Sequence, residues 1–185
     1  MAAPSVKAVL ILDCNDGSRV HAKYYSKYFK DVAAQKAFEL NLFSKTRAQS
    51  ARSEAEIAML DSTVCVFKSG IDVMFYVCGE PDENELILTT VLDAIFDSLN
   101  GILRSHLEKR TLLDNLDLVF LTVDEVIDGG LILETEPVAI ANRVLMKGAA
   151  GSSGPGGAED VPMNELTIAQ ALQSAREQLA KSFRN

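Results

Sequence analysis

Two segments of this sequence are apolar on both faces of an extended chain, and they constrain the fold more than any other feature. In Val6–Asp13 and again in Ile71–Cys78, both sets of alternating residues are apolar. Because successive side chains of a strand point to opposite faces, each segment must be covered from both sides. We therefore expect two central strands of a sheet that lies between helical layers.

Three further segments predict the remaining strands. Arg19–Tyr25 alternates, with His21 and Lys23 on one face, which is typical of an edge strand. Glu56–Asp61 is half polar and also suits a rim, and Thr63–Lys68 is the third segment. Face polarity then predicts a five-stranded antiparallel sheet in the order 2-1-5-4-3, counted along the chain.

Helical spacing of apolar residues predicts two helices that pack on this sheet. The first is Asp31–Gln49, with Asp31 as N-cap, and the second begins after Asn84 and keeps one apolar stripe from Leu88 to Leu103. One face of the second helix must be buried. Together, the strands and helices indicate an α/β (α+β) domain.

The segment Leu116–Ile127 is apolar nearly all round, and its composition also suits a strand. We favour a helix because Gly129-Gly130 follows as a C-terminal stop. In that helix, Asp124 and Glu125 would face water, together with Asp128.

The C-terminal part of the chain predicts a linker followed by a separate helix. Residues 148–162 are rich in glycine and predict a flexible linker after a domain of residues 1–147. Residues 163–185 predict an amphipathic helix, whose apolar stripe includes Leu172 and Leu179. We expect these two leucines to pack against protein rather than lipid.

Charge and cysteine content exclude several classes of protein. Acidic residues outnumber basic ones 26 to 18, which argues against nucleic acid or anionic lipid as a target of the whole surface. The apolar run that ends at Asp13 is too short for a signal sequence or a spanning helix. The three cysteines form no C-x-x-C pair, and we expect Cys65 and Cys78 to be core residues in a reducing cytosol.

No pattern in the sequence indicates catalysis. His21 and His106 are the only histidines, and neither lies in a metal-ligand or nucleophile motif. Asp93 and Asp97 lie one helical turn apart, but opposite the apolar stripe, where a solvated face is expected. We therefore predict no catalytic residue, no metal site and no cofactor, although a triad assembled in space would escape a reading of this kind.

Several motifs resemble the adaptor complex small chains of vesicle coats. The resemblance is carried by Asp-Gly-Ser-Arg at 16–19, Ala-Lys-Tyr-Tyr at 22–25 and Leu-Asp-Leu-Val-Phe at 116–120. Within that family, the segments 121–130 and 132–135 are most similar to the zeta chains of the COPI coatomer. The resemblance implies a longin/SNARE-like domain and a non-catalytic role in the coat.

The family implies specific partners. Its small chains bind the trunk of a large subunit, which here would be gamma-coatomer, within the complete set of coatomer subunits. An Arf-type GTPase recruits that coat to the cytosolic face of Golgi membranes and COPI vesicles, for retrograde Golgi-to-ER and intra-Golgi transport. The membrane contact of this cytoplasmic chain would then be peripheral and indirect.

Candidate interface residues follow from the same resemblance. We predict that the chain contacts its partners through Tyr24, Tyr25, Leu118, Phe120, Leu172 and Leu179. Related endocytic chains read acidic dileucine signals with an arginine that aligns with Val20. Because Arg19 is displaced by one residue, we expect its side chain on the opposite face of the strand. We therefore do not expect this chain to bind acidic dileucine signals in that manner.

Two other classes of function stay open at this stage. A longin-type regulator of vesicle tethering or GTPase exchange would share the fold, and an exchange assay with small GTPases would identify it. A small hydrolase with a spatially assembled triad would react with serine- or cysteine-directed activity probes.

Overall fold

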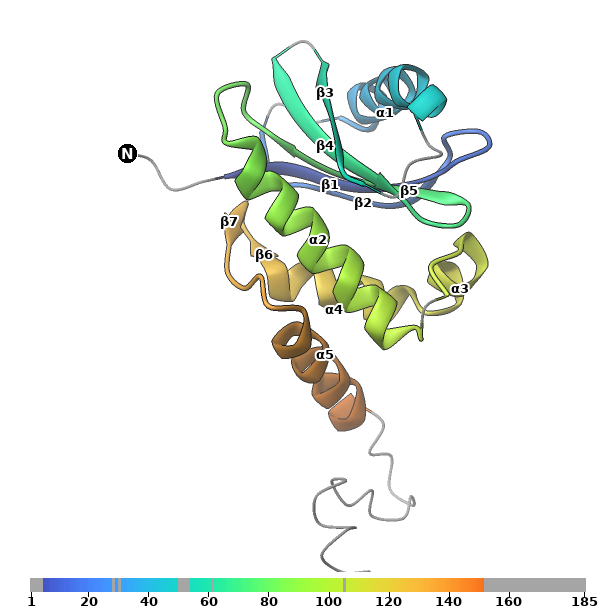
Figure 1. Ribbon diagram of the computed structural model, residues 1–185, viewed down its shortest axis with the longest axis vertical. Coiled ribbons are helices and arrows are strands. Elements are labelled where there is room, and N and C mark those ends of the chain that lie inside the picture. Colours follow the sequence, from blue (N-terminus) through green and yellow to red (C-terminus); the bar gives the residue numbers. More distant parts are fainter. Residues whose placement is uncertain are drawn as a thin grey trace, which may run out of the picture. The chain divides into compact units, whose positions relative to one another are not determined.

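A five-stranded antiparallel sheet forms the centre of the domain (Figure 1). The computed structural model describes residues 5–151, apart from 28, 30, 50–53, 61 and 105. The strand order β2-β1-β5-β4-β3 confirms the predicted 2-1-5-4-3 order. The strands are β1 (Val6–Asp13), β2 (Arg19–Tyr24), β3 (Glu56–Leu60), β4 (Thr63–Ser69) and β5 (Val73–Gly79).

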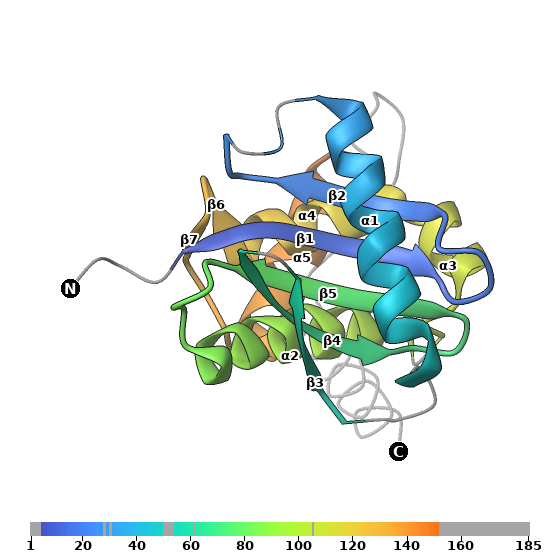
Figure 2. The same ribbon diagram turned by 90° about the horizontal axis from the view of Figure 1, so that it is seen from above.

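Helices cover both faces of this sheet. Helix α1 lies across one face, and α2 and α4 cover the other, with α5 packed against them (Figures 1 and 2). The bounds are α1 (Val32–Thr46), η1 (Arg47–Gln49), α2 (Glu85–Ile102), α3 (Lys109–Asp114), α4 (Leu116–Val126) and α5 (Pro137–Gly151). This arrangement confirms the longin-like α+β fold.

The predicted N-caps fix the starts of the two long helices. The Asp31 carboxylate accepts a hydrogen bond from the Ala34 amide at 2.6 Å, and the Asn84 side chain accepts one from the Leu86 amide at 2.9 Å. Each cap satisfies a backbone donor that has no partner inside its helix. Each cap thereby reduces the number of unsatisfied donors at the start of its helix.

The core consists of two apolar layers, one on each side of the sheet. Val9 and Ile11 of β1 pack with α2 and α4, whereas Leu10 and Leu12 pack with α1. Both faces of β1 are thus covered, as its sequence predicts. Cys65 and Cys78 belong to the α1-side layer and are fully buried, together with the residues Ala8, Leu42, Leu60, Met74 and Tyr76.

The region after α4 differs from the prediction in two respects. The helix is confirmed, but Gly129-Gly130 forms the turn of a small hairpin of β6 (Ile127–Asp128) and β7 (Leu131–Ile132), not a helix stop. Glu125 does not face water, because its side chain is 11% exposed and pairs with Arg143 at 3.6 Å. The return of α5 beside α4 buries this carboxylate.

Other boundaries also differ from those read off the sequence. Strand β5 begins at Val73, and Ile71 lies in the preceding turn with 68% of its surface exposed. Helices α3 and α5 were not predicted, and α5 extends to Gly151, into the first residues of the predicted linker. The remaining linker residues and the predicted helix 163–185 lie outside the described residues.

Candidate partner interface

Strand β2 and helix α4 meet along a contact that we call the β2–α4 seam, formed by His21, Lys23, Tyr25, Phe120 and Asp124. The first three alternate along the strand and the last two lie one helical turn apart, so each set shares a face. The Phe120 ring centroid lies 5.0 Å from that of His21, edge to face. Lys23 pairs with Asp124, and its Nζ lies 5.2 Å from the Tyr25 ring centroid. The His21–Lys23 face of this edge strand is therefore covered by a helix.

The seam contains polar groups that are buried without partners. His21 is 3% exposed, and neither of its ring nitrogens has a hydrogen-bond partner in the described part of the chain. Burial, helped by the Lys23 charge, lowers the pKa of His21 to about 4. The Tyr25 hydroxyl is also buried and unpartnered, and burial raises its pKa. Both side chains are uncharged at neutral pH.

Phe120 is the predicted interface residue that projects most from the seam. Half of its surface is exposed, whereas Leu118 packs against the edge of the core and is only partly accessible. His21 supports the inner edge of the Phe120 ring. A ring held in this way presents a fixed apolar surface, which is the property of residues at the centre of protein interfaces.

Tyr24 lies on the other face of the sheet, away from the seam. Its hydroxyl donates a hydrogen bond to Glu39 Oε1 of α1 at 2.8 Å, and its ring lies 4.9 Å from that of Phe29. Tyr25 and Phe120 therefore lie along the same seam, against Lys23 and His21 respectively, whereas Tyr24 lies on the other face of the sheet. Leu172 and Leu179 lie outside the described residues.

A register shift opposite Leu12 decides where Arg19 and Val20 point. Strand β1 pairs Ile11 with His21 and Leu12 with Arg19, so Val20 is an extra residue in β2. Val20 packs into the core on the α2–α4 side, whereas Arg19 extends toward α1. The two side chains project from opposite faces, as expected, although the shift rather than simple alternation places Arg19 beside Tyr24.

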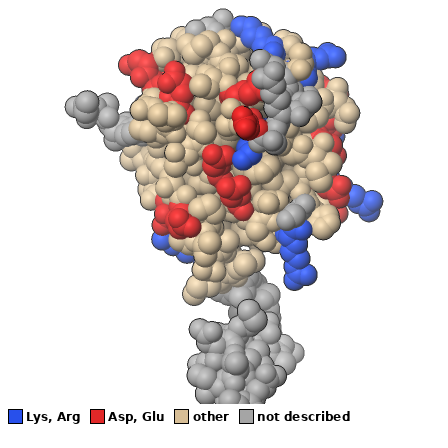
Figure 3. All heavy atoms as spheres, in the orientation of Figure 1, with Lys and Arg blue, Asp and Glu red and all other residues tan. Residues whose placement is uncertain are grey.

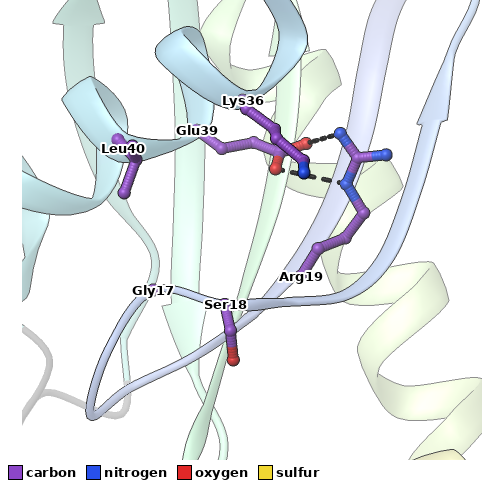
Figure 4. Close-up of a pocket in the computed structure, with 6 residues that line it drawn as sticks. All are labelled: Gly17, Ser18, Arg19, Lys36, Glu39 and Leu40. Atoms are coloured by element: carbon purple, nitrogen blue, oxygen red, sulfur yellow. Dashed lines mark hydrogen bonds and ion pairs between the residues drawn. The ribbon is translucent and has the colours of Figure 1, made fainter. Parts of the chain in front are cut away.

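Arg19 lines a shallow pocket of about 350 Å³ between α1 and the β1–β2 turn (Figure 4). Its guanidinium contacts both oxygens of Glu39, at 2.7 Å and 3.2 Å, and Glu39 is buried. The charge of Arg19 is therefore neutralised by a carboxylate of the domain itself. The other lining residues are Gly17, Ser18, Lys36 and Leu40.

We expect acidic dileucine peptides not to bind this chain with micromolar affinity. The position that aligns with the family's signal-reading arginine holds Val20 in the core, and Arg19 is occupied by Glu39. Fluorescence anisotropy with a labelled acidic dileucine peptide measures this directly. Micromolar binding that is lost in an Arg19→Ala variant would contradict the expectation.

Apolar surface also occurs on elements that the sequence reading missed. Val138, Leu145 and Met146 on α5 are each more than half exposed, as are Leu131 and Leu133 around β7. Helix α5 is thus apolar on two sides, because Ile140 and Val144 are fully buried in the core. The four-residue spacing of Ile140 and Val144 was the signal that could have revealed this helix.

The described residues contain no group of three or more His, Cys, Asp or Glu side chains that could hold a metal ion. A search of the same residues finds no helix with the length and apolarity needed to cross a membrane. What the surface does offer is a set of exposed apolar side chains on α4, on α5 and around β7. This arrangement suits contact with other proteins.

The fold is that of an adaptor complex small chain, and comparisons with known proteins agree. Residues 5–150 match the family "Clathrin adaptor complex small chain". A chain in a homology model of the full-length AP-3 complex shares the fold, with a TM-score of 0.61, 17% identity, and coverage of 80% of this chain and 96% of that one.

Closer relatives are coatomer subunits. Coatomer subunit zeta-1 of Bos taurus is 50% identical over 179 residues, which covers 97% of this chain and 93% of that protein. The Homo sapiens protein is 49% identical over the same shares, and the Arabidopsis thaliana zeta-1 subunit is 45% identical, with 97% of both chains covered. The chain belongs to the coatomer zeta branch of the clathrin adaptor complex small-chain family.

Proposed function

We propose that this chain is a non-catalytic structural subunit of the COPI coat that binds the trunk of gamma-coatomer. The observation that carries the proposal is the near full-length similarity to coatomer zeta subunits from animals and plants. In this role the chain acts with the other coatomer subunits, and an Arf-type GTPase reaches it only through the assembled coat. It works on the cytosolic face of Golgi membranes, in retrograde and intra-Golgi transport.

The exposed apolar residues support a permanent partner. Phe120 on α4, Leu133 just after β7 and Leu145 on α5 are at least half exposed. On the face seen in Figure 3, broad areas without charged side chains separate the acidic and basic groups. A curved helical trunk would cover such separated positions at once, and burying them would contribute about 25 cal/mol for each Å² of apolar surface.

Within this proposal the β2–α4 seam is a trunk contact, with Phe120 as its central residue. The proposed contacts beside it are Tyr25, whose ring lies near Lys23, and Leu118, which packs against the edge of the core. Tyr24, Leu172 and Leu179 are further proposed contacts on other parts of the chain. The aromatic character and fixed position of Phe120 make it the residue whose loss should weaken the complex most.

Co-expression with a gamma-coatomer trunk tests the proposal. We expect a stable one-to-one complex on gel filtration, and an affinity at least about tenfold weaker for Phe120→Ser in a titration. Leu40→Ser is the matched control, since Leu40 is 60% exposed on α1, on the opposite face of the sheet. Failure of the unmodified chain to co-purify would refute the partner, whereas loss of binding only in Leu40→Ser would move the interface to α1.

A further inference from the structure

The outer edge of β3 is an open strand edge at the opposite rim of the sheet from the β2–α4 seam. Within the described residues, β3 pairs only with β4. Sheet edges are normally protected by lysine, proline or a bulge. The sequence Glu56–Leu60 contains neither residue, and its pairing with β4 shows no register shift.

The register tells which backbone groups face outward. Leu60 pairs with Thr63 across a two-residue loop, so these two residues form a hydrogen-bonded pair next to the turn. Hydrogen-bonded pairs alternate along an antiparallel ladder, so Ala58 and Glu56 also direct their amides toward β4. The N–H and C=O groups of Ile57 and Met59 therefore point away from the sheet.

The same two residues carry exposed apolar side chains. Ile57 and Met59 are each 54% exposed, and they pair with Val66 and Val64 of β4, which belong to the core on the α2 side. They thus extend the apolar face of the sheet beyond the cover of α2. An added strand would find both main-chain partners and an apolar surface at the same positions, which is the requirement for strand addition.

We infer that the β3 edge binds an extended segment of another protein, with alternating apolar residues flanked by lysine or arginine. The charges of the edge support this choice, because residues 54–60 include Glu54 and Glu56 but no lysine or arginine. A second copy of this chain fits poorly. Its own residues 54–60 carry two glutamates and no lysine or arginine that could pair with those of the first copy. The inference does not depend on the proposed gamma-coatomer contact.

A designed peptide probes this edge in the full chain. The probe is acetyl-Lys-Val-Lys-Val-Thr-Val-Lys-amide, and the matched peptide carries N-methyl groups on alternate amides, which block pairing on one edge. We expect the first peptide to protect the Ile57 and Met59 amides from hydrogen exchange in NMR spectra. The N-methylated peptide should leave these two amides unprotected when its N-methylated edge faces β3.

Substitutions in the protein itself test the same edge. Met59→Pro removes an outward-facing N–H and leaves the ladder to β4 intact, so the fold should persist. We expect peptide binding to weaken roughly tenfold in Met59→Pro, but not in Met59→Leu. A circular dichroism spectrum and thermal midpoint like those of the unmodified chain establish that Met59→Pro is folded.

Three outcomes would overturn the inference. The first is a lack of protection at Ile57 and Met59 when the peptide is in excess. The second is equal binding of the peptide by Met59→Pro and Met59→Leu. The third is a dimer of the chain alone, seen by analytical ultracentrifugation and abolished by Met59→Pro, because the occupant would then be a second copy.

Discussion

Acidification from pH 7 to pH 4 is expected to lower the free energy of unfolding by about 3 kcal/mol through His21 alone. Burial in the β2–α4 seam lowers the pKa of His21 to about 4 in the folded chain, against 6.5 for a free side chain. Between these values the unfolded chain binds a proton that the folded chain does not. Stability therefore falls as the pH drops from 6.5 to 4, and this contribution is constant above and below that window.

Burial causes most of this effect, and charged groups around His21 modify it. Lys23 and Arg19 oppose a second positive charge, and Asp124 favours one, but burial is the largest influence. Phe120, which covers the imidazole from α4, offers no hydrogen bond to the protonated ring. Among the described residues, none accepts a hydrogen bond from either ring nitrogen of His21.

A His21→Leu variant separates this contribution from the titration of carboxylates. Because both ring nitrogens lack partners, leucine should fold at least as stably as histidine at pH 7. Urea unfolding of both chains at several pH values measures the difference, which should grow by about 3 kcal/mol toward pH 4. A constant difference across this range would show that His21 is protonated in the folded state.

The central sheet is the part of the fold that sequence reasoning predicted best. Segments that are apolar on both faces can only lie inside a layered domain, and β1 and β5 lie there. The polar faces of the predicted second and third strands placed them at the rims. These conclusions required only the alternation of apolar and polar residues within each strand, which does not depend on distant parts of the chain.

The seam could not be predicted in the same way. Lys23 and Asp124 are 101 positions apart in the sequence, and nothing local shows that α4 returns over β2. The polar residues His21 and Lys23 therefore indicated an open face where the structure has a buried one. The extra residue at Val20 was equally hidden, because it shows only in the pairing with β1.

The relatives explain why the family was easier to predict than the interface. Motifs such as those at 16–19 and 116–120 identify the family through residues that shape turns and the core. Residues proposed to face a partner, such as Phe120, cannot be told from other apolar residues in a single sequence. Their role depends on a surface that belongs to another chain.

The Gly129-Gly130 turn gives the second large effect, because only one of its two glycines touches the rest of the domain. Both have positive φ, at +57° for Gly129 and +89° for Gly130. A β-carbon on Gly130 would lie 2.9 Å from the Val6 carbonyl oxygen and 3.3 Å from Tyr25 Cβ, whereas one on Gly129 would meet nothing within 4 Å. The Gly130 carbonyl also accepts a hydrogen bond from the Val6 amide at 2.8 Å.

Gly130→Ala should therefore lower the free energy of unfolding by about 3 kcal/mol, and Gly129→Ala by about 1 kcal/mol. The smaller value is the backbone strain of an alanine at positive φ. The larger value also includes the cost of displacing β1 from the hairpin. Because the contact atom is a main-chain oxygen, no side-chain rotation can relieve it. Urea unfolding of the two variants at pH 7 compares the midpoints directly. Equal losses would mean that the turn moves freely away from β1, and that β6 and β7 do not hold the start of the sheet.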